Sequence, residues 1–326
     1  MKCTVCRAPA VVDVRRHNAG FCADHFITHV RRQVARTIDE FDMFDHDDRL
    51  LIAVSGGKDS LALWDVLIEL GYDVTGVYLD LGIGGYSTRS KEATISFAQQ
   101  RDAKVIARCI EQEHGFSVPQ LATLTNRPAC SGCGLNKRYE LNRAALQEGF
   151  EVLVTGHNLD DEVATLFGNV LHWNVDMLGR QAPVLEEKVL PGATRPALIR
   201  KAKPLVRLAE RETAAYALLR GIDYVVEECP MVAGNTQHRY KEALTLLEER
   251  SPGTKHQMYF GFLTRAAERF RSQEPADAAV VACVSCGAPT VAWEEGDEPV
   301  CSFCRTKALA EQRRAGGYLP RRAHRQ

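Results

Sequence analysis

Short apolar runs alternate with amphipathic stretches along the middle of the chain, and together they predict a sheet covered by helices. Runs of four to six largely apolar residues, each followed by glycine, polar or charged residues, are typical of strands buried on both faces. The stretches between them carry apolar residues at helical spacing, and one of them stops at a glycine. The predicted strands are 50–54, 74–79, 104–108, 152–155 and 222–226, and the predicted helices are 26–41, 60–70, 90–101, 135–148 and 209–220.

This regular alternation predicts an α/β fold with a doubly wound parallel sheet. Residues 241–271 are expected to be mostly helical, with a break at Pro252-Gly253, and 274–277 has the composition of a linker. We therefore divide the chain into an N-terminal module (1–28), an α/β domain (29–273) and a C-terminal module with a basic tail (274–326).

Composition narrows the class of protein. The 326 residues are 45% hydrophobic and 25% charged, which excludes wholesale disorder. No run approaches 18 apolar residues and the N-terminus lacks the apolar core of a signal peptide, so we expect a cytoplasmic protein without a membrane span. With 41 basic against 42 acidic residues, any affinity for RNA must come from local patches.

The 11 cysteines are an odd number and most of them occur in close pairs, which in a reducing compartment indicates metal ligands rather than disulfides. Two sets have the spacing of structural zinc sites, with a pair of ligands, 14 or 15 intervening residues and a second pair. All four positions of each set are filled, which favours stabilisation and RNA docking over catalysis. The predicted ligands of two Zn²⁺ ions are Cys3, Cys6, Cys22 and His25, and Cys283, Cys286, Cys301 and Cys304.

A glycine-rich loop lies between the first predicted strand and the following helix. Its two glycines let the backbone pass close to a ligand, and the helix N-terminus and a lysine add positive charge. The spacing differs from that of Walker A and resembles the PP-loop signature SGGxDS of ATP pyrophosphatases, which have a HUP-like fold. The alternative is a plain glycine turn that joins the strand to the helix. The resemblance implies that ATP is bound by Ser55, Gly56, Gly57, Lys58, Asp59 and Ser60, with the adenine near Ala53 and Leu79.

A CxxC pair precedes the predicted helix 135–148. Cys130 and Cys133 could be half of a zinc site, a redox pair that carries persulfide sulfur, or ligands of an iron–sulfur cluster; inert buried thiols are the remaining alternative. Cys229 follows the predicted fifth strand and should emerge at the same sheet edge as the glycine-rich loop, while Cys109 ends the third strand. We predict that Cys130, Cys133 and Cys229 bind a 4Fe-4S cluster and leave one iron without a protein ligand.

Lys137 lies one helical turn beyond Cys133, so its ammonium group should reach back toward the cysteine loop. There it would stabilise negative charge on an activated oxygen or phosphate; a solvated lysine is the alternative.

The stretch 155–162 follows the fourth strand and opens a helix. Gly156 allows close approach to a ligand, Asp160 is a candidate N-cap, and Asp161 is predicted to hold Mg²⁺ or accept a proton. The acidic residues could equally serve only the helix dipole.

Two basic segments are candidates for contact with RNA phosphates, although a solvated tail is the alternative for the second. They comprise Arg195, Arg200, Lys201 and Lys203, and then Lys307, Arg313, Arg314, Arg321, Arg322, His324 and Arg325.

Taken together, SGGKDS, CSGCG, TGHNLDDE and ECP between two cysteine modules resemble the TtuA-type tRNA 2-thiouridine synthetases of the TtcA/TtuA group. The resemblance runs through nearly the whole chain. It implies a homodimer that uses ATP and a 4Fe-4S cluster to replace the C2 oxygen of a tRNA uridine by sulfur. The expected base is 5-methyluridine at position 54, and the expected donor is a ubiquitin-like carrier protein with a thiocarboxylated C-terminus. It also implies that Lys137, Gly156 and Asp161 join Ala53, Leu79 and residues 55–60 around the nucleotide, and that Lys137, Asp161, Cys130, Cys133 and Cys229 are catalytic.

Three other functions fit parts of this sequence. A thiolase of the same family could act on the wobble uridine of the anticodon. A PP-loop synthetase could instead adenylate and amidate a small molecule, which would leave both cysteine modules and the cysteine triad without a use. A zinc-ribbon protein that only binds RNA would leave the glycine-rich loop unexplained.

Overall fold

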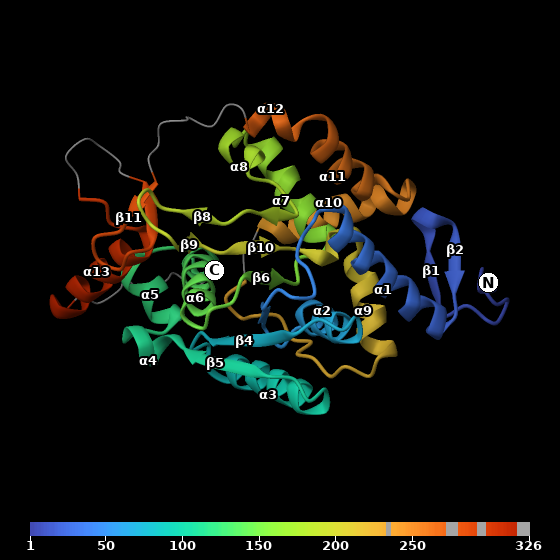
Figure 1. Ribbon diagram of the computed structural model, residues 1–326, viewed down its shortest axis with the longest axis horizontal. Coiled ribbons are helices and arrows are strands. Elements are labelled where there is room, and N and C mark those ends of the chain that lie inside the picture. Colours follow the sequence, from blue (N-terminus) through green and yellow to red (C-terminus); the bar gives the residue numbers. More distant parts are fainter. Residues whose placement is uncertain (233–235, 272–279, 292–297, 318–326) are drawn as a thin grey trace, which may run out of the picture.

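A six-stranded, mainly parallel sheet forms the centre of the computed structural model, with helices on both of its faces (Figure 1). The structure describes residues 1–326 except 233–235, 272–279, 292–297 and 318–326. The strand order is β5-β4-β3-β6-β10-β7, and only β7 runs antiparallel to its neighbour. The strands are β3 (Leu50–Val54), β4 (Val74–Asp80), β5 (Val105–Cys109), β6 (Val152–Thr155), β7 (Val184–Leu185) and β10 (Arg200–Ala202).

The predicted doubly wound α/β fold is confirmed, and each predicted helix is present, some with shifted ends. Residues 241–271 contain three helices, and a turn at Pro252-Gly253 separates the first two. The helices are α1 (Ala23–Glu40), α2 (Lys58–Glu69), α3 (Gly84–Gln100), α4 (Ile110–His114), α5 (Val118–Thr125), α6 (Ala129–Gln147), α7 (Leu159–Leu171), α8 (Val175–Gly179), α9 (Glu210–Leu219), α10 (Thr236–Arg250), α11 (Thr254–Arg265) and α12 (Ala267–Arg271).

The central strand shows why this sheet is buried on both faces. Leu50, Ile52 and Val54 of β3 pack into a core with α1, α2 and α9, whereas Leu51 and Ala53 pack on the opposite side with residues of α6. Successive side chains of a strand point to opposite faces, so an uninterrupted apolar run is what a strand covered on both sides requires.

The predicted fifth strand, 222–226, is wrong. Its place beside β6 is taken by β10, whose residues Arg200, Lys201 and Ala202 pair with Val152, Leu153 and Val154. β10 has three residues, two of them cationic, and therefore lacks the apolar run that marks the other strands. Residues 222–226 run instead beside the glycine-rich loop.

One contact shows this placement: the Val225 amide donates to the Gly56 carbonyl oxygen at 2.9 Å. Ile222 is buried but Val226 is 78% exposed, so this segment has only one end in the core.

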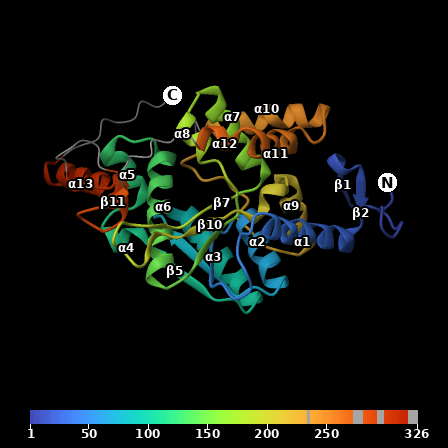
Figure 2. The same ribbon diagram turned by 45° about the horizontal axis from the view of Figure 1, so that its top comes forward.

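The two cysteine modules lie at opposite ends of the molecule (Figure 2). The first contains β1 (Val12–Val14) and β2 (Ala19–Phe21), and the second contains β11 (Val280–Ala282), β12 (Pro289–Val291) and α13 (Ser302–Ala315). The proposed boundary between residues 28 and 29 falls within α1, while the boundary at 273/274 and the predicted linker 274–277 lie outside the described residues.

In the part of the chain that the structure describes, no helix combines the length and apolar character needed to cross a bilayer.

Candidate active site and metal centres

The glycine-rich loop joins β3 to α2 and is held by its own serines. The Ser60 hydroxyl accepts a hydrogen bond from the Ser55 amide at 3.2 Å and donates one to the Gly57 carbonyl oxygen at 3.0 Å. Gly56 has φ +73°, and a Cβ there would lie 2.5 Å from the Ser90 carbonyl oxygen. A side chain at position 56 is therefore excluded by both conformation and space. Gly57 is the N-cap of α2, so the free amides of that helix face the loop.

Lys58 and Asp59 connect this loop to α9. Lys58 Nζ lies 3.1 Å from Asp59 Oδ2 and 2.7 Å from Glu210 Oε1, where Glu210 is the first residue of α9. Asp59 Oδ1 accepts hydrogen bonds from the Thr213 hydroxyl and, at 3.1 Å, from the Asn158 side-chain amide. The starts of α2, α7 and α9 are thus joined at one carboxylate.

Lys241 of α10 brings a second ammonium group to the same place. Its Nζ lies 2.6 Å from Asp161 Oδ1 and 2.9 Å from Glu210 Oε2. Because Lys58 binds the other oxygen of Glu210, one carboxylate bridges two lysines. The loop is therefore bordered by the ammonium groups of Lys58 and Lys241 and the carboxylates of Asp59, Asp161 and Glu210.

These contacts shift the protonation equilibria. Burial alone would raise the pKa of Glu210, but Lys58 and Lys241 outweigh it and lower that pKa to about 2. Burial alone would lower the pKa of Lys241, but Asp161 and Glu210 raise it above its usual value. For Asp59, burial is the largest influence and its pKa is raised in spite of Lys58. Lys241 and Glu210 therefore stay charged at neutral pH, and both ammonium groups keep the charge that a phosphate would bind.

The start of α7 corrects one prediction. The N-cap is Asn158, which forms a capping box with Asp161, and Asp160 instead forms an ion pair with Lys255 and accepts the Glu210 amide at 2.8 Å. Gly156 is needed for packing, since a Cβ there would lie 2.9 Å from the Ser60 amide nitrogen. The start of α2 therefore lies against this glycine, and a contact between Gly156 and the nucleotide stays a prediction.

Ala53 and Leu79 lie near the carboxyl ends of β3 and β4, on the face of the sheet that α6 covers. The structure therefore brings the predicted adenine contacts to the same edge and face as the central cysteines.

The CxxC pair lies within α6 and not in a loop before it, so the predicted start of this helix at residue 135 is wrong. Cys130 and Cys133 belong to its first two turns, and the Cys130 thiol donates to the Met231 carbonyl oxygen at 3.3 Å. Cys133, Cys229 and Met231 pack, partly buried, against the same apolar cluster. The two segments that carry the predicted triad thus meet, although Cys229 does not follow a strand.

Two pKa shifts follow from the closeness of the thiols to one another. Burial is the main cause that raises the pKa of Cys133, and Cys229 and Cys130 add to it. Tyr86 of α3 has a raised pKa for the same reasons, first burial and then Cys229 and Cys133. Lys137 acts in the opposite direction on Cys133, as its place one turn along α6 predicts.

The donor set fits an iron–sulfur cluster better than zinc. A tetrahedral zinc ion with Zn–S bonds of about 2.3 Å holds its sulfurs about 3.8 Å apart. Both terminal sets keep all ligand atoms within 4.8 Å of one another, whereas Cys130, Cys133 and Cys229 form no group of that kind among the described residues. A multi-iron cluster carries its thiolates on different irons, and three soft sulfur donors at a wider spacing suit it.

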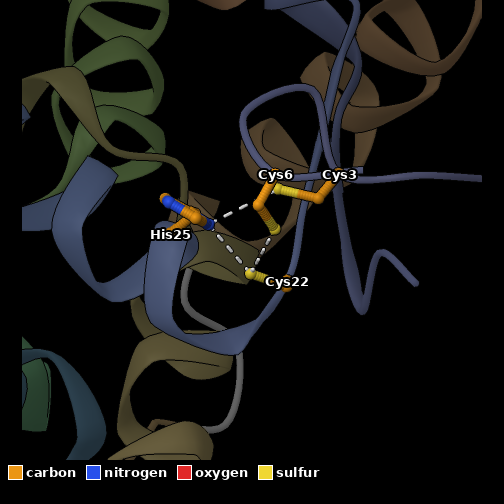
Figure 3. Close-up of side chains that lie close together, drawn as sticks. All are labelled: Cys3, Cys6, Cys22 and His25. Carbon is orange, nitrogen blue, oxygen red and sulfur yellow. Dashed lines mark hydrogen bonds between the residues drawn. The ribbon is translucent and has the colours of Figure 1, made fainter. Parts of the chain in front are cut away.

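The N-terminal set has the geometry of a zinc site (Figure 3). The sulfurs of Cys6 and Cys22 lie 3.7 Å apart, and His25 Nδ1 lies 3.1 Å from the Cys22 sulfur and 3.7 Å from that of Cys3. Burial would raise the pKa of Cys3, but backbone N–H groups, among them that of Cys6, lower it to about 6 and favour the thiolate that binds metal.

The C-terminal set has the same character. The sulfurs of Cys286 and Cys301 lie 3.7 Å apart, and the Cys301 amide donates to the Cys283 sulfur at 3.2 Å. Burial and then the neighbouring thiols Cys286 and Cys301 raise the pKa of Cys304. Four sulfurs so close can all ionise only beside a cation, so both cysteine clusters fit zinc-binding modules.

Most predicted RNA-binding residues that the structure describes make contacts inside the protein. Arg200 pairs with Glu186 at 2.9 Å and Lys203 with Glu162 at 2.9 Å. In α13, Arg313 donates to the Leu124 carbonyl oxygen and Arg314 stacks on Phe116, so they dock this helix on α5 and the segment before it. Lys307 pairs with Glu311 within α13, and Arg195 is exposed. Arg321, Arg322, His324 and Arg325 lie outside the described residues.

Sequence reasoning missed Glu210, Lys241 and Tyr86. Each belongs to a helix distant in sequence from the motif that it contacts, and none is part of a short motif. The sequence predicts the helices that contain Lys241 and Glu210, but it gives no sign that either residue belongs to the active site.

We expect that Cys286→Ala reduces zinc from about two ions per chain to about one and leaves iron unchanged. The reason is that the two cysteine sets share no ligand and lie at opposite ends of the molecule. Metal analysis of the purified variant, with Cys22→Ala as the matched change in the other module, checks this. Loss of both zinc ions in either variant would show that the modules are not independent.

Comparisons with known proteins agree with this site. A family model described as the PP-loop domain matches residues 27–243, and one described as the N-terminal LIM domain of the 2-thiouridine synthetase TtuA matches residues 2–27. The protein named tRNA-5-methyluridine(54) 2-sulfurtransferase from Thermus thermophilus is 45% identical over 94% of this chain and 90% of its own. The protein of the same name from Thermotoga maritima is 38% identical over 96% of this chain and 98% of its own.

Two further matches act, by their names, on tRNA. The tRNA 2-thiolation protein NcsA of Haloferax volcanii is 30% identical over 94% of this chain and 98% of its own. A solved structure, described as the U34-tRNA thiolase NcsA from Methanococcus maripaludis with its 4Fe-4S cluster, superposes with a TM-score of 0.72. It is 24% identical and covers 86% of this chain and 91% of its own, so it supports the fold.

Proposed function

This chain belongs to the TtuA-type family of PP-loop tRNA 2-sulfurtransferases, and on that premise we propose that it converts the C2 oxygen of 5-methyluridine 54 in tRNA to sulfur. The observation that carries the proposal is the meeting of two sites at one sheet edge. A nucleotide loop with paired lysines and a triad of thiols both lie at the carboxyl ends of β3 and β4. An amidating synthetase has no use for the second of these sites.

The glycine-rich loop supplies the activation step. A carbonyl oxygen leaves poorly, so O2 of the uridine attacks the α-phosphorus of ATP and pyrophosphate departs, which leaves AMP on the oxygen. Lys58, Lys241 and the amides at the start of α2 are positioned to bind the negative charge that develops on the departing phosphates. Asp161 would hold a Mg²⁺ ion that binds the same phosphates, with Asp59 beside it.

The three thiols serve the sulfur-transfer step. Cys130, Cys133 and Cys229 would hold a 4Fe-4S cluster, which supplies an iron with an open coordination position able to carry sulfur. In the second step a sulfur nucleophile adds to C2 and AMP leaves with the original oxygen. Lys137, whose positive charge acts on Cys133 from the next turn of α6, would stabilise the negative charge that passes through the base to the leaving AMP.

Burial of the thiols keeps water away from the reactive sulfur. The base at position 54 must therefore leave its stacked position in the tRNA to reach that sulfur.

Zinc in both terminal modules and two partners belong to the same proposal. The cysteine modules would hold one Zn²⁺ each as structural ions, since no ligand position is left open. A ubiquitin-like carrier protein with a thiocarboxylated C-terminus would deliver the sulfur, and two chains would form a homodimer. Family membership alone supports these two partner assignments.

A second target base has specific support. Two of the matched proteins are named as an NcsA thiolation protein and a U34-tRNA thiolase, and the first is 30% identical to this chain. The higher identity to the proteins named for position 54 favours that base.

Mass spectrometry of nucleosides from bulk tRNA of a deletion strain separates the two targets. Loss of 2-thio-5-methyluridine supports position 54. Loss of a wobble 2-thiouridine with the position-54 product retained would contradict it.

A further inference from the structure

Two cations on the sulfur side of the active site have no counter-charge. Among the described residues, neither Arg138 of α6 nor Lys201 of β10 makes an ion pair or a side-chain hydrogen bond with a carboxylate. Three other described basic residues near this edge, Lys58, Lys203 and Lys241, are each paired with an acidic side chain. Lys137, which precedes Arg138 on α6, also makes no ion pair among the described residues, so three cations gather here without an anion. Leaving like charges together in this way costs free energy.

α6 lies beside the strand that leads into β10 (Figure 1). The contacts between these two segments place the two cations opposite each other. The Asn142 side chain of α6 binds the backbone of β9 (Pro196–Leu198) and of the residue after it: it donates to Ala197 O at 2.9 Å and accepts from Ile199 N at 3.0 Å. Arg138 lies one helical turn before Asn142, and Lys201 lies two residues beyond Ile199. α6 runs antiparallel to β6, and β10 runs parallel to it, so both steps lead toward the carboxyl edge of the sheet.

Lys201 lies on the face of the sheet that α6 covers. It pairs with Leu153 of β6, and Leu153 and Ile199 are both buried in the cluster beneath α6. Side chains two apart on a strand share a face. The electrostatics agree with this placement, because the pKa of Lys201 is lowered first by burial and then by Arg138 and Lys203.

The pair adjoins the cysteines. The Arg138 guanidinium folds back over Gly134, so that a Cβ on that glycine would lie 3.2 Å from Nη1. Gly134 follows Cys133, and Arg138 and Lys137 both act on the pKa of Cys133. The N-terminus of the 19-residue helix α6 adds its own partial positive charge at the same end.

From this juxtaposition we propose that Arg138 and Lys201 bind a backbone phosphate of the substrate tRNA, next to the uridine that enters the site. The inference rests on the proposed function. Arg138 is exposed and presents a planar fork that suits a phosphodiester, while the half-buried Lys201 lies behind it as a point charge. A nucleotide whose base is turned into a pocket leaves its own phosphates at the rim, which is where this pair lies.

The test is equilibrium binding of a tRNA transcript to Arg138→Ala and Lys201→Met at several salt concentrations. Each variant is expected to weaken binding about 5- to 10-fold at 0.1 M salt and to reduce the slope of log K against log salt by about one. Arg138→Lys should restore most of the slope. Iron content and ATP affinity should stay at wild-type values, because neither cation contacts a cysteine ligand or the glycine-rich loop. Lys104→Ala, an exposed lysine just before β5 at the opposite edge of the sheet, is the matched control and should change nothing.

Three results would overturn the proposal. Variants that bind tRNA as well as wild type, with an unchanged salt slope, would overturn this inference alone. Variants that lose iron while they bind tRNA normally would show that the pair neutralises the metal site. A wild-type protein that binds no tRNA would overturn the proposed function together with this inference.

Discussion

Replacing Cys229 by alanine is expected to lower iron from about four atoms per chain to below about one and to abolish thiolation, while both zinc ions stay bound. Cys229 is the only member of the triad outside α6, and it meets Cys133 against the same apolar cluster. Two thiols of one helix cannot enclose a cluster from both sides. ATP binding should survive, because the ion-pair partners of Lys58 and Lys241 among the described residues are Asp59, Asp161 and Glu210, none of which this change removes. Anaerobic purification followed by iron, sulfide and zinc analysis and a visible spectrum checks this result.

Cys109→Ala is the matched control for this experiment. Cys109 ends β5, the outer strand of the sheet, and the thiols that act on the pKa of Cys133 are Cys229 and Cys130. This variant should keep its iron and its activity. If Cys229→Ala retained a full cluster while Cys109→Ala lost it, the third ligand would be Cys109. An iron-free yet active wild-type protein would favour persulfide transfer through the CxxC pair.

Lys241→Met is expected to reduce AMP formation from ATP by about 10²- to 10³-fold, the loss typical of removing one charge-stabilising group from a reaction centre. Lys241 pairs with Asp161 and Glu210, and Lys58 pairs with Asp59 and Glu210. Without the Lys241 ammonium group, Lys58 alone of these two lysines would offset the three carboxylates beside a bound triphosphate. Glu210→Gln should have a smaller effect, since both lysines would remain. Steady-state and single-turnover assays of AMP release, with tRNA present, measure both variants.

The control for Lys241 is Arg250→Ala, at the exposed last residue of the same helix. It should leave the rate unchanged. Because Lys241 also joins α10 to α7, the melting temperature and zinc content of Lys241→Met must be measured alongside. A wild-type rate of AMP release in a folded Lys241→Met protein would exclude Lys241 from the nucleotide site.

The parts of the molecule that sequence alone could predict are those in which neighbouring residues determine the outcome. Three strands of the sheet, β3, β4 and β6, are largely apolar runs, and their burial on both faces requires that pattern. The glycine-rich loop is six consecutive residues between a strand and a helix, and both metal modules repeat a ligand pair at fixed spacing. In each case one short segment carries most of the structural information.

The parts that sequence could not predict depend on segments far apart in the chain. β10 becomes a strand because β6 offers an open edge, although Arg200 and Lys201 lack an apolar pattern. Residues 222–226 are mostly apolar like a buried strand, but Val225 hydrogen-bonds to the loop at Gly56 instead. The bridge from Lys58 through Glu210 to Lys241 spans more than half of the chain, and no local pattern marks it. Cys229 lies near Cys133, as the sequence predicts, although the prediction relied on a fifth strand at 222–226 that does not form.

Thiolation with purified components is the most direct test of the proposed reaction. The anaerobically purified protein is incubated with ATP, Mg²⁺, sulfide and a tRNA that carries 5-methyluridine at position 54, and the nucleosides are then analysed by mass spectrometry. We predict that 2-thio-5-methyluridine forms only when ATP is present, with one AMP released for each sulfur incorporated. AMP release without any thiolated nucleoside, or thiolation that needs no ATP, would contradict the account.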